Sequence, residues 1–276
     1  AARKAGAGQV DASLELYDEI LGHLPRDVQS RLRQVRIHMS VQNMDAAEAI
    51  AAELASDAKA GGSARSAARE TLADIALRRG QTTQAAAAYA EVEREVFSRA
   101  RMRKLLVKQA AVAHPRAPAL IDYLYARASL KARLKTTNAL LDSDPNWPIG
   151  RYLRGRVQLG TRDVTAALND LKVMARSQGP AALRFESYRL MAARAFDEKC
   201  YSEAAQAYTA LAQRKEFKLT QSERNALSRW ARRSHFFEEK DPRAGQRCSI
   251  EIDIAGNPPQ DSAEDGNSDD GPPVQD

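Results

Sequence analysis

The residues of this chain that could catalyse a reaction or hold a metal ion are its histidines, cysteines and acidic pairs. The histidines lie in separate segments, without the short spacing that brings two metal ligands together: His23, His38, His114 and His235. The acidic pairs, Glu238-Glu239 and Asp269-Asp270, fall at the end of an expected helix and in a polar tail. Neither position is suited to a cleft that excludes water around a general acid or base.

Sequence motifs of known catalytic sites are also missing. The chain contains no HExxH or GxSxG pattern, no Walker A sequence and no glycine-rich dinucleotide-binding turn. We therefore expect no enzyme, and so no catalytic residues, no metal site and no cofactor.

The two cysteines, Cys200 and Cys248, are too few for a disulfide framework and lack the spacing of metal ligands. They leave the redox compartment open. Because Cys200 falls at the turn between two expected helices, we expect a small, half-buried thiol there.

Charge is unevenly distributed along the chain. The formal net charge is +6, from 42 basic and 36 acidic residues. Six of the acids lie in Asp261–Asp276, which has no base, so residues 1–260 carry a charge of +12. A basic body attracts nucleic acid, anionic lipid or acidic proteins, and the acidic tail can compete for the same surface. The alternative is scattered surface charge that only maintains solubility.

No run of about 18 apolar residues is present, so we expect no membrane span. The chain opens with AARKAGAGQ, which has neither the Met nor the apolar core of a signal peptide. We expect a soluble protein of unassigned compartment.

The elements that must position any binding residues are short amphipathic helices in pairs. Between Val28 and Leu54 one apolar face is formed by Leu32, Val35, Met39 and Val41. After a break at Gln42-Asn43 a second face is formed by Met44, Ala47, Ala51 and Leu54. Spacings of three and four residues predict two helices joined by a tight turn. The second face repeats, 34 positions on, the pattern of Val10, Ser13, Tyr17 and Ile20.

A helical hairpin that recurs with a period of about 34 residues indicates stacked repeats, because one hairpin cannot bury both of its faces alone. This pattern resembles the tetratricopeptide repeat (TPR) family. Ala85 and Tyr89 match the small and aromatic positions of the TPR pattern. Further on, the spacing of Val10, Ser13, Tyr17 and Ile20 recurs at Tyr201, Ala204, Tyr208 and Leu211. The fold class that the resemblance implies is all-α, a right-handed α-solenoid of TPR-like hairpins.

The expected array occupies residues 1–242. Its units are 1–25 (partial, from a chain that looks cut from something longer), 26–60, 63–97, 98–144 (degenerate), 145–178 and 181–215, followed by a capping helix over 219–239. Thr220 or Ser222 is the expected N-cap of that last helix. An extended segment over 243–256 and a disordered acidic tail over 257–276 complete the chain. How the helices between Ser98 and Asp144 pair is left open.

In TPR arrays the first helices of successive units line a concave groove that holds the ligand. The resemblance therefore implies groove and partner-binding positions here, namely Arg36, Met39, Glu70, Asp74, Arg78, Arg154, Arg189 and Phe196. Arginine suits such positions because its planar guanidinium binds carboxylates with two hydrogen bonds. The competing interpretation is that these side chains are only solvated.

One TPR subclass clamps the C-terminal carboxylate of chaperones with Lys and Asn, but Leu32 and Arg36 stand at those positions here. We therefore expect a non-catalytic interaction scaffold that binds another protein or peptide segment, within a larger protein or complex. One alternative is the helical accessory region of an enzyme whose catalytic domain is missing. Another is an RNA-binding helical repeat, which the basic body favours but the lack of regularly recurring base-reading residues disfavours. The oligomeric state is left unassigned.

Overall fold

The computed structural model describes residues 10–95, 99–126, 128–161, 163–241 and 248–254. These residues form thirteen α-helices and one short 3-10 helix, and they contain no strand. The expected all-α class is therefore confirmed for the described part of the chain. The expected helical stub over residues 1–7 and the acidic tail over 257–276 lie outside it.

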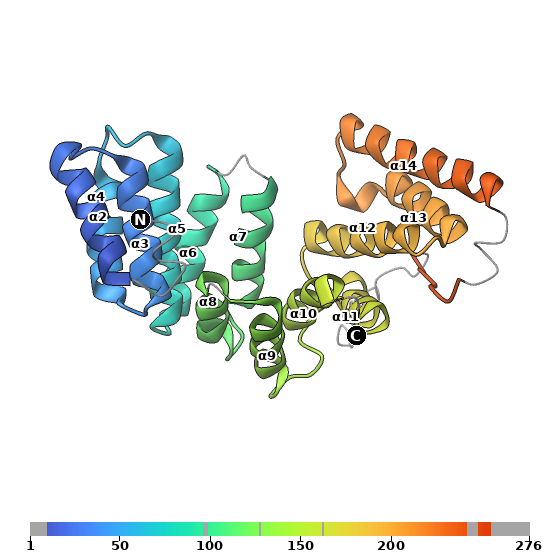
Figure 1. Cartoon of the computed structure of the whole chain (residues 1–276), viewed down its shortest axis with the longest axis horizontal. Coiled ribbons are helices and arrows are strands. Elements are labelled where there is room, and N and C mark those ends of the chain that lie inside the picture. The colour runs from blue at the N-terminus through green and yellow to red at the C-terminus, as the bar shows by residue number, and fades with distance from the viewer. Residues whose placement is uncertain (1–9, 96–98, 127, 162, 242–247, 255–276) are drawn as a thin grey trace, which may run out of the picture.

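The first seven helices cover the N-terminal half of the chain and are labelled as in Figure 1. They are α2 (Val10–His23), α3 (Val28–Ser40), α4 (Met44–Ser56), α5 (Gly62–Arg78), α6 (Thr82–Glu93), α7 (Arg99–Ala111) and α8 (Ala117–Tyr125). The remaining elements are α9 (Leu130–Leu141), α10 (Pro148–Thr161), α11 (Val164–Ala175), α12 (Ala181–Asp197), α13 (Tyr201–Gln213), η1 (Lys215–Phe217) and α14 (Gln221–Lys240).

Local signals set the ends of several helices. Asp27 caps α3 by accepting hydrogen bonds from the backbone N–H groups of Gln29 and Ser30. Thr220 caps α14, and Glu223 returns a bond to the Thr220 backbone N–H, which forms a capping box. Thr220 is thus confirmed as the N-cap. Gly80 ends the α5 turn with a φ of 79°, in the left-handed region that glycine enters without a steric penalty.

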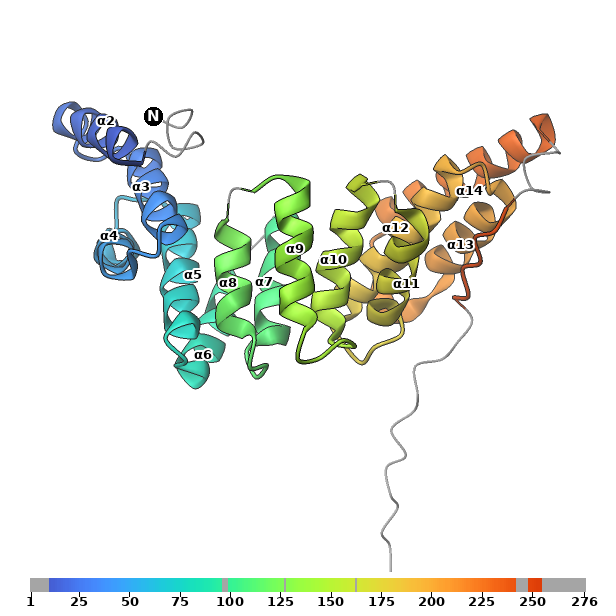
Figure 2. The same ribbon diagram turned by 60° about the horizontal axis from the view of Figure 1, so that its bottom comes forward.

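Successive helices pack mainly on their neighbours in sequence, from the pair α2 and α3 to the pair α13 and α14. Figure 2 shows them side by side in a row, with α2 at one end and α14 at the other. Small residues lie fully buried where helices approach closely, and large ones fill the spaces between pairs, as with Ala85 and Tyr89 or Ala51 and Leu54. The buried apolar residues form one connected cluster that runs from α3 to the last helices.

Helices α7 and α8 interrupt the simple order of neighbours. Helix α7 contacts not only α6 and α8 but also α10 and α12, and α8 packs back on α3 and α5. Helix α9 packs on α10. The sequence left open how the helices between Ser98 and Asp144 pair. In the structure α8 packs on the N-terminal helices and α9 packs on α10, while α7 contacts helices of both groups (Figure 1).

The segment from Cys248 to Ile254 lies beside α11 and α13. Cys248 forms a disulfide with Cys200, 48 positions earlier in the sequence, and Ile250 and Ile254 are buried. The expectation of a half-buried thiol at Cys200 is wrong, because the side chain is buried and bonded. Residues 248–254 have neither helix nor strand, in keeping with an extended segment, and the rest of 243–256 lies outside the described residues.

None of the helices in the described ranges combines the length and the apolar character that crossing a lipid bilayer requires.

Candidate functional site

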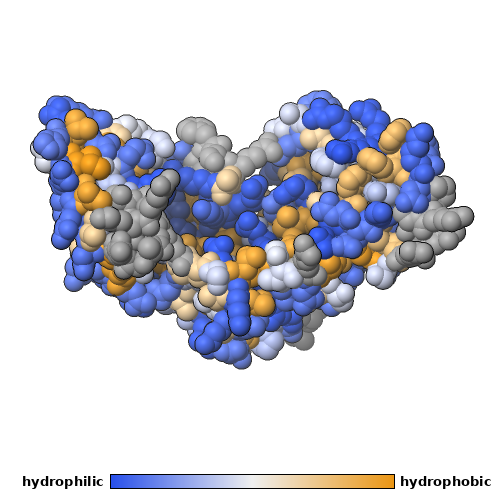
Figure 3. Space-filling model, viewed as in Figure 1, coloured by the Kyte–Doolittle hydropathy of each residue, from blue (hydrophilic) through white to orange (hydrophobic). Residues whose placement is uncertain are grey.

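The molecular surface is hollowed between the side that carries α2–α7 and the side that carries α12–α14 (Figure 3). Two pockets are lined by helices that border this region. The basic pocket, of about 660 Å³, is lined by residues of α3, α5, α7, α8, α9 and α10. The aromatic pocket, of about 760 Å³, is lined by residues of α7, α12, α13 and α14. We call the residues that line the two pockets the inner surface.

The basic pocket collects cations from four helices. Apart from Lys108, which is paired with Asp74 and Glu70, they are Arg33 and Arg36 of α3, Arg103 and Lys104 of α7, Arg133 of α9 and Arg156 of α10. Among the described residues, only Arg103 of these six has a carboxylate within 4 Å, that of Glu186 at 3.9 Å. The buried Nε of Arg133 has no hydrogen-bond partner in the same part of the chain. Cations brought together without anionic partners repel one another, and a bound anion would relieve that repulsion.

Tyrosine rings hold two of these arginines in place. The guanidinium carbon of Arg133 lies 5.5 Å from the ring centre of Tyr123, and that of Arg156 lies 5.6 Å from the ring centre of Tyr152. Such cation–π contacts fix the direction of a side chain without neutralising its charge. The two arginines are therefore ordered and still positive.

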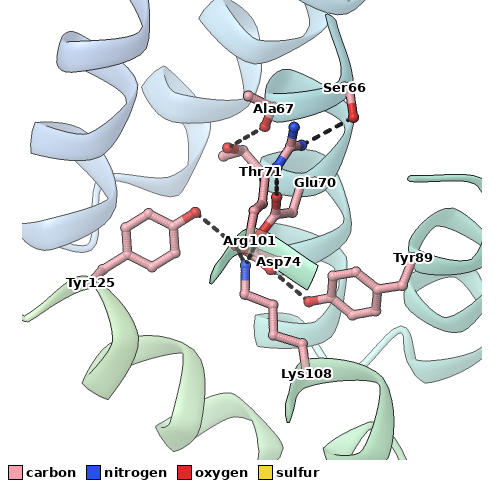
Figure 4. Close-up of polar contacts among 9 residues, drawn as sticks. All are labelled: Ser66, Ala67, Glu70, Thr71, Asp74, Tyr89, Arg101, Lys108 and Tyr125. Carbon is pink, nitrogen blue, oxygen red and sulfur yellow. Dashed lines mark hydrogen bonds and ion pairs between the residues drawn. The ribbon is translucent and has the colours of Figure 1, made fainter. Parts of the chain in front are cut away.

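A buried polar network forms the base of the basic pocket (Figure 4). The Asp74 carboxylate accepts hydrogen bonds from Tyr89 Oη at 2.6 Å, from Tyr125 Oη at 2.7 Å and from Lys108 Nζ at 2.6 Å. Lys108 Nζ also donates to Glu70 at 2.7 Å, and Arg101 Nε donates to the other Glu70 oxygen at 2.8 Å. These bonds join α5, α6, α7 and α8.

Electrostatics keep this network in one protonation pattern. Burial raises the pKa of Asp74, although the Lys108 ammonium acts against the shift. Burial would lower the pKa of Lys108, but Asp74, Tyr125 and Glu70 outweigh it and raise that pKa well above its ordinary value. Burial and the Asp74 charge raise the pKa values of Tyr89 and Tyr125, so both phenols remain donors. The bonds of the network are made within the protein, and we infer that it positions the pocket wall.

The aromatic pocket is lined by rings from α12, α13 and α14, which are Phe185, Phe196, Tyr208 and Trp230. Phe196 meets Trp230 edge to face, with ring centres 5.4 Å apart. Arg233 lies over both rings, 5.6 Å from the centre of Phe196 and 5.0 Å from that of Trp230. Trp230 is 40% exposed, which is high for so large an apolar side chain.

Arg103 is the residue that lines both pockets. Glu186, its nearest carboxylate, is already bound through both oxygens by Arg189, at 2.8 Å each. A separation of 3.9 Å between Arg103 and Glu186 is too long for a hydrogen bond. Arg103 therefore stands between the pockets without a carboxylate at hydrogen-bonding distance in the described part of the chain.

Four of the residues expected at the groove line the inner surface. Arg36 and Glu70 line the basic pocket, and Arg189 and Phe196 line the aromatic pocket. Arg36 is exposed, with no ionic partner among the described residues. Glu70 and Arg189 are engaged in intramolecular ion pairs. Their roles in partner binding remain predictions.

The other four do not lie at the pockets. Met39 and Asp74 were expected at the groove, but they are buried, at 2% and 0% exposed, and so offer no surface to a partner. Arg78 is paired with Asp122 at 2.9 Å, and Arg154 binds Asp170 with two nitrogens at 2.6 and 2.8 Å. The repeat register placed these residues on the correct helices but could not show which of them were paired internally.

Sequence reasoning missed most of the inner-surface residues, among them Arg33, Arg103, Lys104, Arg133, Arg156 and Trp230. Three of these, Arg103, Lys104 and Arg133, lie in the segment 98–144, where the repeat register is poor and assigns no groove positions. The concentration of basic residues in RMRKLLVK, residues 101–108, was the available signal.

One group of residues in the described chain has the proximity that a metal site needs, Cys200, Glu203 and Cys248. The two sulfur atoms are joined in the disulfide, so they do not act as thiolate ligands in this state. We therefore do not assign these three residues as a metal site.

Comparison with models of protein families, with curated proteins and with solved structures finds no match for this chain. The resemblance to TPR proteins therefore rests on the repeat spacing and the small and aromatic positions of the hairpins.

Proposed function

We propose that this chain is a non-catalytic interaction scaffold that binds a protein or peptide segment on its inner surface. In this proposal the row of helices is a right-handed α-solenoid of TPR-like hairpins, with α14 as its capping helix, in a larger protein or complex. The observation that carries it is the set of cations around the basic pocket. Arg33, Arg36 and Lys104 have no carboxylate partner among the described residues and come from two helices far apart in sequence.

The rigidity of the surroundings supports binding at this place. Asp74, Lys108 and their partners tie four helices together beneath the basic pocket, so the helices that carry the cations are already fixed before a ligand binds. Preorganised surfaces lose less conformational entropy on association and therefore retain more of the contact free energy. An extended segment that touches several helices at once suits a surface of this kind.

Single-stranded RNA is the competing ligand, because it is also anionic. Proteins that bind single strands without reading their sequence combine cations with exposed aromatic rings on which bases stack. In the basic pocket Tyr123 is 5% exposed and lies beneath Arg133, and the Tyr125 hydroxyl is bonded to Asp74. The basic pocket thus offers charge without an open ring face. In the adjoining aromatic pocket Arg233 lies over the Phe196 and Trp230 rings, which leaves less ring face for a stacked base and favours a polypeptide ligand.

Affinity capture with three proteins tests the proposal. The intact chain is compared with the double variant Arg36→Glu/Lys104→Glu and with the matched double variant Lys135→Glu/Arg232→Glu, whose residues are exposed and line neither pocket. We expect the first variant to lose partners that the intact chain and the second variant retain. A partner list that is unchanged in Arg36→Glu/Lys104→Glu would contradict binding at the inner surface.

A further inference from the structure

The two pockets of the inner surface are chemically different and adjoin at Arg103. On the α3 and α9 side the lining is cationic, and on the α12 and α14 side it is aromatic. A ligand that crosses Arg103 therefore meets both chemistries within one short stretch. The two linings together therefore restrict the ligand to one that is both acidic and apolar, which neither pocket does alone.

The basic side fits carboxylates on a flexible chain. Apolar residues line this pocket beside its cations, and one of them, Leu130, is 46% exposed. A surface that combines charge with hydrocarbon suits glutamate and aspartate side chains, which present a carboxylate on an apolar stem. Five of its cations are arginines, whose planar guanidinium binds a carboxylate with two parallel hydrogen bonds.

The aromatic side fits one bulky apolar side chain. Its volume of about 760 Å³ lies in the range of pockets that hold substantial ligands, and it is framed by Phe185, Phe196 and Trp230. Offset and edge-to-face ring contacts there would add to the gain from burying apolar area. Arg189 on this side is already paired with Glu186, while Arg233 is held over the rings and keeps its charge.

We propose that the inner surface binds an acidic peptide segment that carries a bulky aromatic or aliphatic residue beside its acids. The acids occupy the basic pocket, the apolar side chain occupies the aromatic pocket, and Arg103 binds the carboxylate nearest the junction. This inference rests on the proposed function, since it names the ligand class of the same surface. It specifies the amino-acid composition of the bound peptide, which the proposed function does not.

Selection of random displayed peptides on the immobilised full chain tests the composition directly. We expect the enriched peptides to contain several Asp or Glu residues next to Trp, Phe or Leu. A synthetic peptide of the enriched sequence is then titrated against the chain and its variants by fluorescence anisotropy. Arg36→Glu/Lys104→Glu is expected to weaken binding by tenfold or more, about 1.4 kcal/mol for each factor of ten.

The two halves of the site are separated by matched peptides and variants. Replacing the apolar residue of the peptide by Ala should weaken binding to the intact chain, but should change little for Trp230→Ala, where its pocket is already altered. Trp230→Leu serves as a milder variant if Trp230→Ala is unstable, and Lys135→Glu/Arg232→Glu is the charge-matched control. Arg103→Ala should weaken binding of the full peptide more than it weakens binding of a peptide that carries only the acids or only the apolar residue.

Three outcomes distinguish this inference from the proposed function. Enriched peptides without acids whose binding is nevertheless lost in Arg36→Glu/Lys104→Glu would overturn the inference and leave the proposed function standing. Peptides that bind all variants equally, or no enrichment at all, would overturn both. A single-stranded RNA homopolymer that binds more tightly than the selected peptide, with a steep salt dependence, would also overturn both.

Discussion

Lys108 Nζ lies 2.6 Å from Asp74 Oδ2, which joins α7 to α5 between residues 34 positions apart. The Lys108 side chain is 5% exposed and that of Asp74 is 0% exposed. A buried ion pair is costly to desolvate, and removal of one partner leaves the other charge uncompensated. The pair therefore makes the arrangement of α5 and α7 sensitive to single substitutions.

We expect Lys108→Met to lower the free energy of unfolding by about 3–5 kcal/mol, because Asp74 and Glu70 would lose their shared cation. The double variant Lys108→Met/Asp74→Asn should recover part of the loss, since one buried charge is then removed. Chemical denaturation measures both. Lys104→Met, on the exposed side of the same helix, is the control, and an equal loss in that variant would contradict the role of the buried pair.

The disulfide between Cys200 and Cys248 should stabilise the C-terminal hairpins. It closes a loop between residues 48 positions apart, for which chain entropy predicts a contribution of up to about 4 kcal/mol. We expect a reducing agent to lower the denaturation midpoint of the intact chain, but not that of Cys200→Ala/Cys248→Ala. Native hydrogen exchange should show Ile250 and Ile254 losing protection on reduction, and unchanged protection would contradict their attachment through this bond.

Gly155 lies where α10 packs tightly against α11. A Cβ atom at this position would lie 3.1 Å from the Ala167 carbonyl oxygen and 3.1 Å from Leu171 Cγ. We expect Gly155→Ala to destabilise the chain by about 1–3 kcal/mol despite the better helix propensity of alanine. Gly22→Ala is the matched control, because a Cβ there meets nothing within 4 Å and should stabilise α2 by up to about 1 kcal/mol. Thermal unfolding compares the two.

Arg154 and Arg36 were both expected at the groove. We expect substitution of Arg154 to change stability and substitution of Arg36 to change peptide affinity. Arg154 is bound to Asp170, so Arg154→Gln should lower the free energy of unfolding by about 1–3 kcal/mol and leave peptide affinity unchanged. Arg36 has no ionic partner among the described residues, so Arg36→Gln should weaken peptide binding with little change in stability. The same effect in both variants would contradict the division between structural and binding arginines.

Acidification should weaken the contacts around Glu186. Burial raises the pKa of Glu186, but Arg189, Arg103 and Arg156 outweigh burial and hold the pKa below its ordinary value of 4.5. The unfolded chain therefore takes up this proton at a higher pH than the folded chain does. The stabilisation is present above about pH 4.5 and is lost as the pH falls through the lower folded pKa. Glu186→Gln should be less stable than the intact chain at neutral pH, and its free energy of unfolding should fall less steeply as the pH is lowered. If the free energies of unfolding of the two proteins run parallel with pH, the prediction is contradicted.

The sequence by itself determined the helices, their turns and the cap of the last one. The apolar spacing between Val28 and Leu54 predicted the break at Gln42-Asn43, and α3 and α4 lie on either side of it. Thr220 was recognised as a possible cap from its place before Glu223. These features depend on residues within a few positions of one another, so local propensity is sufficient to predict them.

The tertiary structure alone decided which charged residues are free and which are paired. Asp74 and Arg154 carry the same sequence signals as exposed groove residues, but their partners Lys108 and Asp170 come from other helices. The disulfide likewise depends on a contact over 48 positions. Helical periodicity has no information about such distances, because it records which face is buried and not what the face meets. The basic and aromatic pockets, which need several helices at once, therefore became visible only in three dimensions.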